Sequence, residues 1–128
     1  MVDGGKIEAF EDLIAWQKAR ILTREIYKVS SVEPLARDFP LRDQMRRSAI
    51  SIMSNIAEGF ERARPNEFHQ FLSIAKASCA ELRSQLYIAL DAGEIHAETF
   101  HRVLALAAEV GRILGGLRAA VERRKTSK

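Results

Sequence analysis

Residues 41–81 read LRDQMRRSAISIMSNIAEGFERARPNEFHQFLSIAKASCAE, and their apolar side chains recur at three- and four-residue spacings on both sides of a short polar turn. This spacing is typical of two amphipathic helices that bury one face each. Gly59 stands where a left-handed C-terminal cap would end the first helix, and Pro65 suits the start of the second. The stretch therefore predicts a helical hairpin.

The flanking sequence has the same periodicity, over residues 10–30 and again over residues 100–121. Asp38 is positioned to cap the helix that follows it, and Gly93 offers the usual exit conformation for the third helix. There is no strand pattern. The sequence therefore predicts an all-α fold, an antiparallel up-and-down four-helix bundle. The predicted division is a flexible N-terminus at residues 1–9, the bundle at residues 10–122 and a basic C-terminal tail at residues 123–128.

The composition is that of one soluble domain, with 128 residues, of which 47% are hydrophobic and 29% charged. No apolar run approaches the ~20 residues that a membrane-spanning helix needs, and the N-terminus lacks the apolar segment of a signal peptide. We therefore expect a cytoplasmic protein without a membrane partner. Cys79 is the single cysteine, which excludes an intramolecular disulfide and a cysteine-based zinc site.

The sequence offers no catalytic residue. A di-iron carboxylate site in a helical bundle needs two Glu-x-x-His pairs, and only Glu98 and His101 have that spacing. Cys79 falls on an apolar helix face, where a free thiol behaves as a small hydrophobe. Neither a nucleophile elbow nor a phosphate-binding glycine loop is present. We expect a protein that is not an enzyme and that has no metal and no cofactor.

The positive charge is concentrated near the C-terminus. The net charge is +3, and residues 97–128 carry seven basic and three acidic side chains. This distribution favours an anionic partner, RNA or DNA, although a basic tail can also simply be solvated. The planar fork of arginine suits phosphate, while salt bridges to Asp43, Glu58 and Glu61 are the competing interpretation. The candidate nucleic-acid-binding residues are Arg42, Arg46, Arg47, Arg62, Arg64, Arg118, Arg123, Arg124 and Lys125.

Small polar residues interrupt the apolar stripe of residues 41–58. Ser48 and Asn55 flank this stripe, and buried polar groups need hydrogen-bond partners. We predict that these two residues join Glu58 or Glu81 in a polar network that fixes the register of the helices. The alternative is that the neighbouring serines, Ser51 and Ser54, face water.

Residues 46–82 closely resemble the four-helix-bundle family of 23S rRNA intervening sequence proteins. The family hallmark has the form R-x-S-I-P-x-N-I-A-E-G, followed by an Arg, then E-F-x-x-F-L-x-I-A and S-x-x-E-L. Met53 and Ala77 depart from it, because the family commonly has proline and glycine there, and both changes favour straighter helices. The matching residues are Ser51, Ile52, Asn55, Ile56, Ala57, Glu58, Gly59, Arg62, Glu67, Phe68, Phe71, Leu72, Ile74, Ala75, Ser78, Glu81 and Leu82, and Arg47 stands two positions before the arginine of the pattern.

The resemblance implies a small bundle that assembles as a homopentameric ring and binds nucleic acid without catalysing a reaction. Residues 108–125, AEVGRILGGLRAAVERRK, are also similar to the accessory variability determinant branch of diversity-generating retroelements. That branch comprises basic pentameric barrels that bind a reverse transcriptase and its RNA. We therefore expect a homo-oligomeric nucleic-acid-binding protein, and the alternative is an adaptor that docks a reverse transcriptase.

Overall fold

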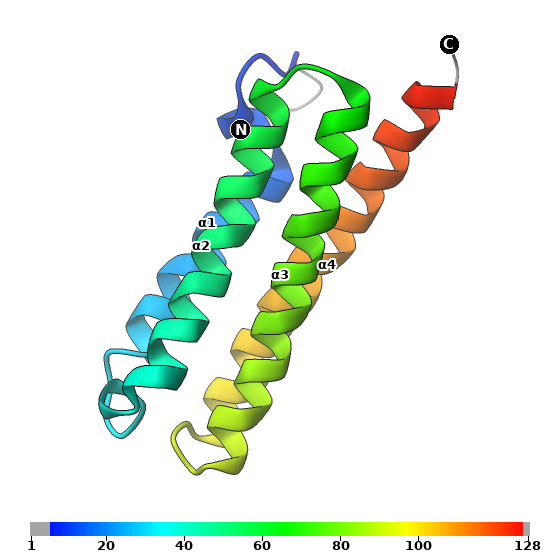
Figure 1. Cartoon of the computed structure of the whole chain (residues 1–128). Coiled ribbons are helices and arrows are strands. Elements are labelled where there is room, and N and C mark those ends of the chain that lie inside the picture. The colour runs from blue at the N-terminus through cyan, green and yellow to red at the C-terminus, as the bar shows by residue number, and fades with distance from the viewer. Residues whose placement is uncertain (1–5, 127–128) are drawn as a thin grey trace.

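The computed structural model describes residues 6–126, and the long elements within them are four helices that lie side by side (Figure 1). Their bounds are α1 Ile14–Val29, α2 Phe39–Glu61, α3 Pro65–Asp91 and α4 Ala97–Thr126, with short 3-10 helices η1 Phe10–Asp12 and η2 Leu35–Arg37. α2 packs against α1 and α3, and α4 packs against α3 and α1. Successive helices run in opposite directions, so the predicted four-helix bundle is confirmed.

One continuous apolar core fills the space between the four helices. Each helix contributes side chains at helical spacing, and burying them supplies the main favourable free energy of folding. The largest fully buried side chains are Leu22, Ile26, Leu35, Met45, Ile52, Ile56, Leu72, Leu82, Leu86, Leu114, Val103 and Val110. None of the helices in residues 6–126 is long and apolar enough to cross a membrane.

Several helix ends lie where the sequence predicts them. The Leu41 backbone N–H donates to Asp38 Oδ1 at 3.3 Å, so Asp38 caps α2. Pro65 is the first residue of α3, where its missing N–H costs no helical hydrogen bond. Gly93 follows α3 with φ +73°, the left-handed conformation that glycine adopts most easily.

The prediction that Gly59 ends α2 is wrong. The helix continues through Glu61, and the left-handed residue after it is Ala63, with φ 62°. Gly59 is buried, and a Cβ atom at this position would lie 2.6 Å from Phe71 Cβ. Glycine is therefore needed here because α2 and α3 approach each other closely, and not because the helix ends.

The two ends of the described chain differ in secondary structure from what the sequence predicts. Within the single helix expected over residues 10–30, Leu13 is extended, with φ −76° and ψ 128°, and it separates η1 from α1. Asp12 accepts hydrogen bonds from the backbone N–H groups of Glu8 and Ala9 at the start of η1. α4 continues to Thr126, so the basic residues 123–125 are helical. Residues 1–5 of the predicted N-terminal segment and residues 127–128 of the predicted tail lie outside the described residues.

Candidate nucleic-acid interface

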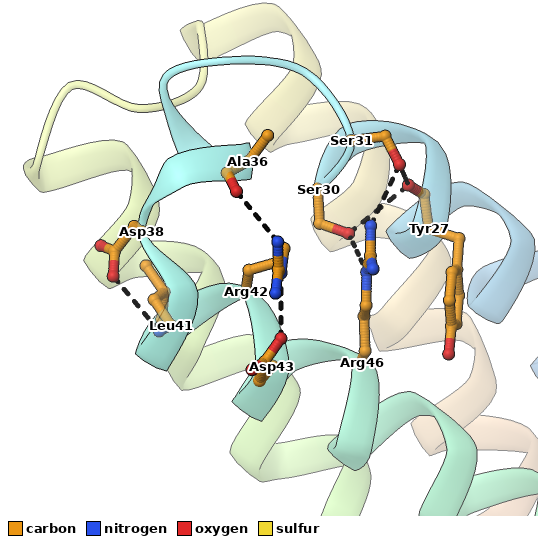
Figure 2. Close-up of polar contacts among 9 residues, drawn as sticks. All are labelled: Tyr27, Ser30, Ser31, Ala36, Asp38, Leu41, Arg42, Asp43 and Arg46. Atoms are coloured by element: carbon orange, nitrogen blue, oxygen red, sulfur yellow. Dashed lines mark hydrogen bonds and ion pairs between the residues drawn. The ribbon is translucent and has the colours of Figure 1, made fainter.

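Arg46 connects α2 to the end of α1. Its Nε donates to Ser30 Oγ at 2.7 Å and its Nη2 donates to Ser31 Oγ at 3.0 Å. The guanidinium also lies over the Tyr27 ring, 4.6 Å from the centroid, and Figure 2 shows the side chain between that ring and the two serines. These contacts occupy the guanidinium, so Arg46 stabilises the junction between the two helices.

Arg42 holds the preceding connection in the same way. Its Nε donates to Asp43 Oδ1 at 2.9 Å, and its Nη1 donates to the Ala36 carbonyl at 3.1 Å (Figure 2). The guanidinium also lies 4.7 Å from the centroid of the Phe39 ring. Arg42 therefore forms the salt bridge to Asp43 that the sequence offers as the alternative to phosphate binding.

The turn between α2 and α3 contains Arg62 and Arg64, and both are exposed. Arg62 pairs with Glu67 at 3.0 Å and with Glu58 at 3.4 Å, and hydrogen bonds to these two carboxylates raise the pKa of the guanidinium. Arg64 Nη1 lies 3.8 Å from Glu67 Oε2. Carboxylates therefore offset part of the positive charge of this turn.

The remaining candidates lie on α2 and α4. Arg47 is exposed on α2, and Arg123 and Arg124 are exposed near the end of α4. Lys125 Nζ pairs with Glu122 Oε1 at 3.2 Å. Arg118 is half-buried, and its Nε is buried without a hydrogen-bond partner in the part of the chain that the structure describes.

The nine candidate residues do not form one patch. The α2–α3 turn and the C-terminal end of α4 lie at one end of the bundle, while the α1–α2 connection with Arg42 and Arg46 lies at the other (Figure 1). At the end with the α2–α3 turn, His69 Nε2 of α3 lies 3.1 Å from Glu122 Oε1 of α4. Arg64 and Lys125 line one hollow at the same end. Arg62, Arg64, Arg118, Arg123, Arg124 and Lys125 therefore gather toward the same end.

Two further cations, Lys76 and Arg83 on α3, continue this charge along the α3–α4 interface. A Cβ atom at Gly115 would lie 3.6 Å from Lys76 Cε, and one at Gly111 would lie 3.7 Å from Arg83 Nη1. The glycines give these long side chains room to lie across α4. Arg118 follows Gly111 by seven positions on α4, so the two residues share a helix face and Arg118 belongs to the same row of cations. We call this row the basic seam, and its members are Arg64, Lys76, Arg83, Arg118 and Lys125.

The middle of the basic seam has no acidic partner. Within residues 6–126, Lys76, Arg83 and Arg118 form no ion pair. Sequence reasoning missed Lys76 and Arg83 because they stand in a segment with more acidic than basic residues. Lys76 and Arg83 are seven positions apart, and Gly111 and Gly115 on the following helix are four positions apart, so each pair shares a helix face. These two spacings are the signal that could have identified the two cations.

Cys79 lies beneath the basic seam and is not a candidate nucleophile. Its thiol is buried, donates to the Ala107 carbonyl at 3.1 Å, and has a raised pKa chiefly because burial disfavours the thiolate. Thiolate is the reactive form, so this environment suppresses reactivity. Among residues 6–126, no three or more His, Cys, Asp or Glu side chains are grouped so that they could hold a metal ion.

The polar network between α2 and α3 differs in membership from the predicted one. Asn55 Nδ2 donates to the Ser51 carbonyl at 2.8 Å and to Ser51 Oγ at 3.0 Å, and Ser51 Oγ lies 2.8 Å from Ser78 Oγ. The two glutamates, Glu58 and Glu81, are exposed instead, and Glu58 pairs with Arg62. Ser48 is buried and Ser54 is exposed. Carboxylates remain at the surface because burying an ionised group is costly, whereas hydroxyl and amide groups can pair between helices.

These features define a small all-α protein, a four-helix bundle with a row of cations along one interhelical seam. The chain belongs to the 23S rRNA-intervening sequence protein family, whose family model matches residues 11–116. The similarity to the accessory variability determinant branch stays a prediction.

A solved structure supports the fold. It is the crystal structure of a protein of unknown function from the S23 ribosomal protein family of Bacteroides thetaiotaomicron. The two chains superpose with a TM-score of 0.76 at 20% sequence identity, over 83% of this chain and 96% of the other. No curated protein matches the sequence.

Proposed function

We propose that the protein is a non-catalytic, homo-oligomeric nucleic-acid-binding protein of the cytoplasm, and that the basic seam contacts the phosphates of RNA or DNA. The observation that carries this proposal is the run of Lys76, Arg83 and Arg118, which share one interhelical seam without an acidic partner among residues 6–126. Elsewhere on the bundle, arginines such as Arg42 and Arg62 are paired with carboxylates.

The linear arrangement of the seam favours a repeating anion over a single one. Lys76 and Arg83 are seven residues apart on one helix, which corresponds to a rise of about 10 Å along its axis. Arg64 and Lys125 extend the row to the end of the bundle, where Arg123 and Arg124 are also exposed. A phosphodiester backbone presents charges at regular intervals, so several cations can engage it at once.

We propose no catalytic reaction for the protein. Cys79, the residue with the greatest intrinsic nucleophilicity, is buried and hydrogen-bonded to a backbone carbonyl. The charged side chains of the seam can bind phosphate but are not arranged as an acid and base around a nucleophile.

Oligomerisation is part of the proposal because one protomer has a net charge of only +3. A homopentamer, which the family resemblance implies, would repeat the basic seam around a ring and add avidity. Large apolar side chains are available for subunit contacts, since Ile50, Ile74 and Ile88 are 45%, 48% and 52% exposed.

A salt titration tests the proposal. Fluorescence anisotropy with a labelled single-stranded RNA and a labelled DNA duplex should show binding that weakens by orders of magnitude between ~50 and ~200 mM salt if ~6 or more phosphates are engaged. Absence of binding to both probes at the lower salt concentration contradicts the proposal. Light scattering on the same sample tests the assembly, and a monomer at micromolar concentration contradicts the homo-oligomer.

A further inference from the structure

Tyr87 continues the basic seam along α3 toward the α3–α4 turn. It follows Lys76 by eleven positions and Arg83 by four, and these spacings place the three side chains on one face of the helix. Its ring packs against the Phe100 ring of α4, with the two centroids 4.9 Å apart and an angle of 67° between the ring planes. Tyr87 therefore lies on the flank of α3 that faces α4, as the two cations do.

The Tyr87 ring is held in place and is still open to solvent. Phe100 is 3% exposed and belongs to the core, whereas Tyr87 is 52% exposed. The contact between the two rings is edge-to-face, which is a favoured geometry for aromatic pairs. A ring that is already fixed in this way loses little side-chain freedom when a flat ligand stacks on it. Tyr87 is therefore preorganised for stacking.

The other two exposed aromatic rings of residues 6–126 are covered by arginines. The Arg46 guanidinium lies 4.6 Å from the centroid of the Tyr27 ring, and the Arg42 guanidinium lies 4.7 Å from that of the Phe39 ring. Among the described residues, the contacts between cations and ring faces do not include Tyr87. Tyr87 therefore combines an open ring with a position beside the basic seam.

The charges on either side of Tyr87 place it at one end of the cationic row. Arg83 precedes it by one helical turn, a rise of about 6 Å along the axis. Asp91 follows it by one turn and is exposed, so the next charge along this face is negative. A polyanion that follows the basic seam therefore meets the ring where the row of cations ends.

We propose that the protein binds single-stranded nucleic acid, with phosphates along Lys76 and Arg83 and a base stacked on the Tyr87 ring. Because the strand would follow the basic seam, this proposal rests on the function proposed above. Proteins that bind single strands combine a cationic groove with aromatic rings on which bases stack. In a duplex, neighbouring bases cover the faces of each internal base, so the ring favours a single strand over a duplex.

Three labelled probes of equal length separate stacking from charge. They are a single-stranded DNA, the same strand paired with its complement, and a strand of stable abasic nucleotides, which keeps the phosphates and lacks the bases. Fluorescence anisotropy at one low salt concentration measures the affinity of the full-length protein for each probe. We expect the wild type to bind the single strand about fivefold or more tightly than the abasic strand. Equal affinities for these two probes overturn the proposal.

Variants of two exposed aromatic residues locate the stacked base. Tyr87→Ala should weaken binding of the single strand by about fivefold or more, and leave binding of the abasic strand and the duplex unchanged. Tyr87→Phe keeps the ring and should retain the wild-type affinity. Phe39→Ala removes a ring that is 57% exposed and lies outside the basic seam, so it should change none of the three affinities.

Thermal denaturation verifies that the variants fold, and Tyr87→Leu, which keeps an apolar side chain against Phe100, replaces Tyr87→Ala if that variant does not. Unchanged affinity of the folded variant for the single strand overturns the proposal. An equal loss for the single strand and the abasic strand also overturns it, because Tyr87 would then only shape the basic seam. In both cases binding by the wild type leaves the proposed function standing, whereas a wild type that binds no probe contradicts both.

Discussion

Gly59 of α2 and Phe71 of α3 approach each other so closely that a Cβ atom added to the glycine would lie 2.6 Å from Phe71 Cβ. The same atom would lie 3.0 Å from Phe68 Cδ1, so two aromatic side chains of α3, Phe68 and Phe71, pack against α2 at Gly59. Phe71 is anchored by its own helix, which means that its Cβ can move only if α3 moves. The hairpin that the family motif encodes therefore depends on the absence of a side chain at position 59.

We predict that Gly59→Ala destabilises the fold by about 1–3 kcal/mol, because overpacking at this contact exceeds the gain of up to about 1 kcal/mol in helix propensity. Gly116→Ala is the matched control, since this exposed helical glycine has nothing within 4 Å of the added Cβ. That change should stabilise the fold by up to about 1 kcal/mol. Urea denaturation of the two variants measures both effects, and equal stabilisation by both substitutions contradicts the packing argument.

The junction of α1 and α2 depends on Arg46. Replacing it with alanine removes hydrogen bonds to Ser30 and Ser31 and the contact with Tyr27, and should cost about 1–2 kcal/mol. Arg47→Ala, one position along, removes an exposed side chain and should change stability by less than about 0.5 kcal/mol. Thermal melts compare the two, and similar losses for both variants would show that Arg46 has no special role.

Ser51 and Ser78 should act as a unit. Their hydroxyl oxygens lie 2.8 Å apart, and Ser51 Oγ also accepts from Asn55. Either serine replaced by alanine should cost about 0.5–1.5 kcal/mol, and the double replacement should cost less than the sum. A double-mutant cycle from denaturation data measures this coupling. Strict additivity of the two substitutions would show that the hydroxyls do not interact in solution.

Glu94 should make stability depend on pH. Burial and Asp38 raise its pKa above the usual 4.5, so the folded state holds the proton to higher pH than the unfolded state does. The stabilisation from this proton is fully present below about pH 4.5 and is lost as the pH rises through the raised pKa. Glu94→Gln cannot ionise, so it should become more stable than the wild type as the pH rises. A difference between the two proteins that stays constant from pH 4 to about pH 8 contradicts this assignment.

The fold could be predicted from the sequence because the apolar residues of all four helices repeat at helical spacing. Caps such as Asp38 and exits such as Gly93 have local chemical causes, so they too could be predicted. Gly59 could not be assigned correctly, since a glycine near a turn has the same local pattern whether it ends a helix or admits a neighbouring one. Only the position of Phe71 distinguishes the two cases.

The candidate interface was harder to predict than the fold. The arginines of the motif could be recognised, but the partners that occupy Arg46 are two serines at the end of another helix, 15 and 16 residues away. Lys76 and Arg83 become candidates only when α4 is placed beside α3 with its glycines facing them. Charge partners depend on which helix faces lie together, and a single sequence does not specify that pairing.

The central claim is that the basic seam binds nucleic acid, and the most direct test compares two triple variants with equal loss of charge. The first replaces Lys76, Arg83 and Arg118 with glutamine, and the control replaces three exposed arginines away from the seam with glutamine. These control positions are Arg20, Arg24 and Arg112. The measurement is the affinity for single-stranded RNA as a function of salt concentration. We predict that the seam variant binds more weakly than the control and that its slope of log K against log salt is smaller by about 2, given about 0.7 per phosphate on a single strand. Identical affinity and slope for the two variants would contradict the account.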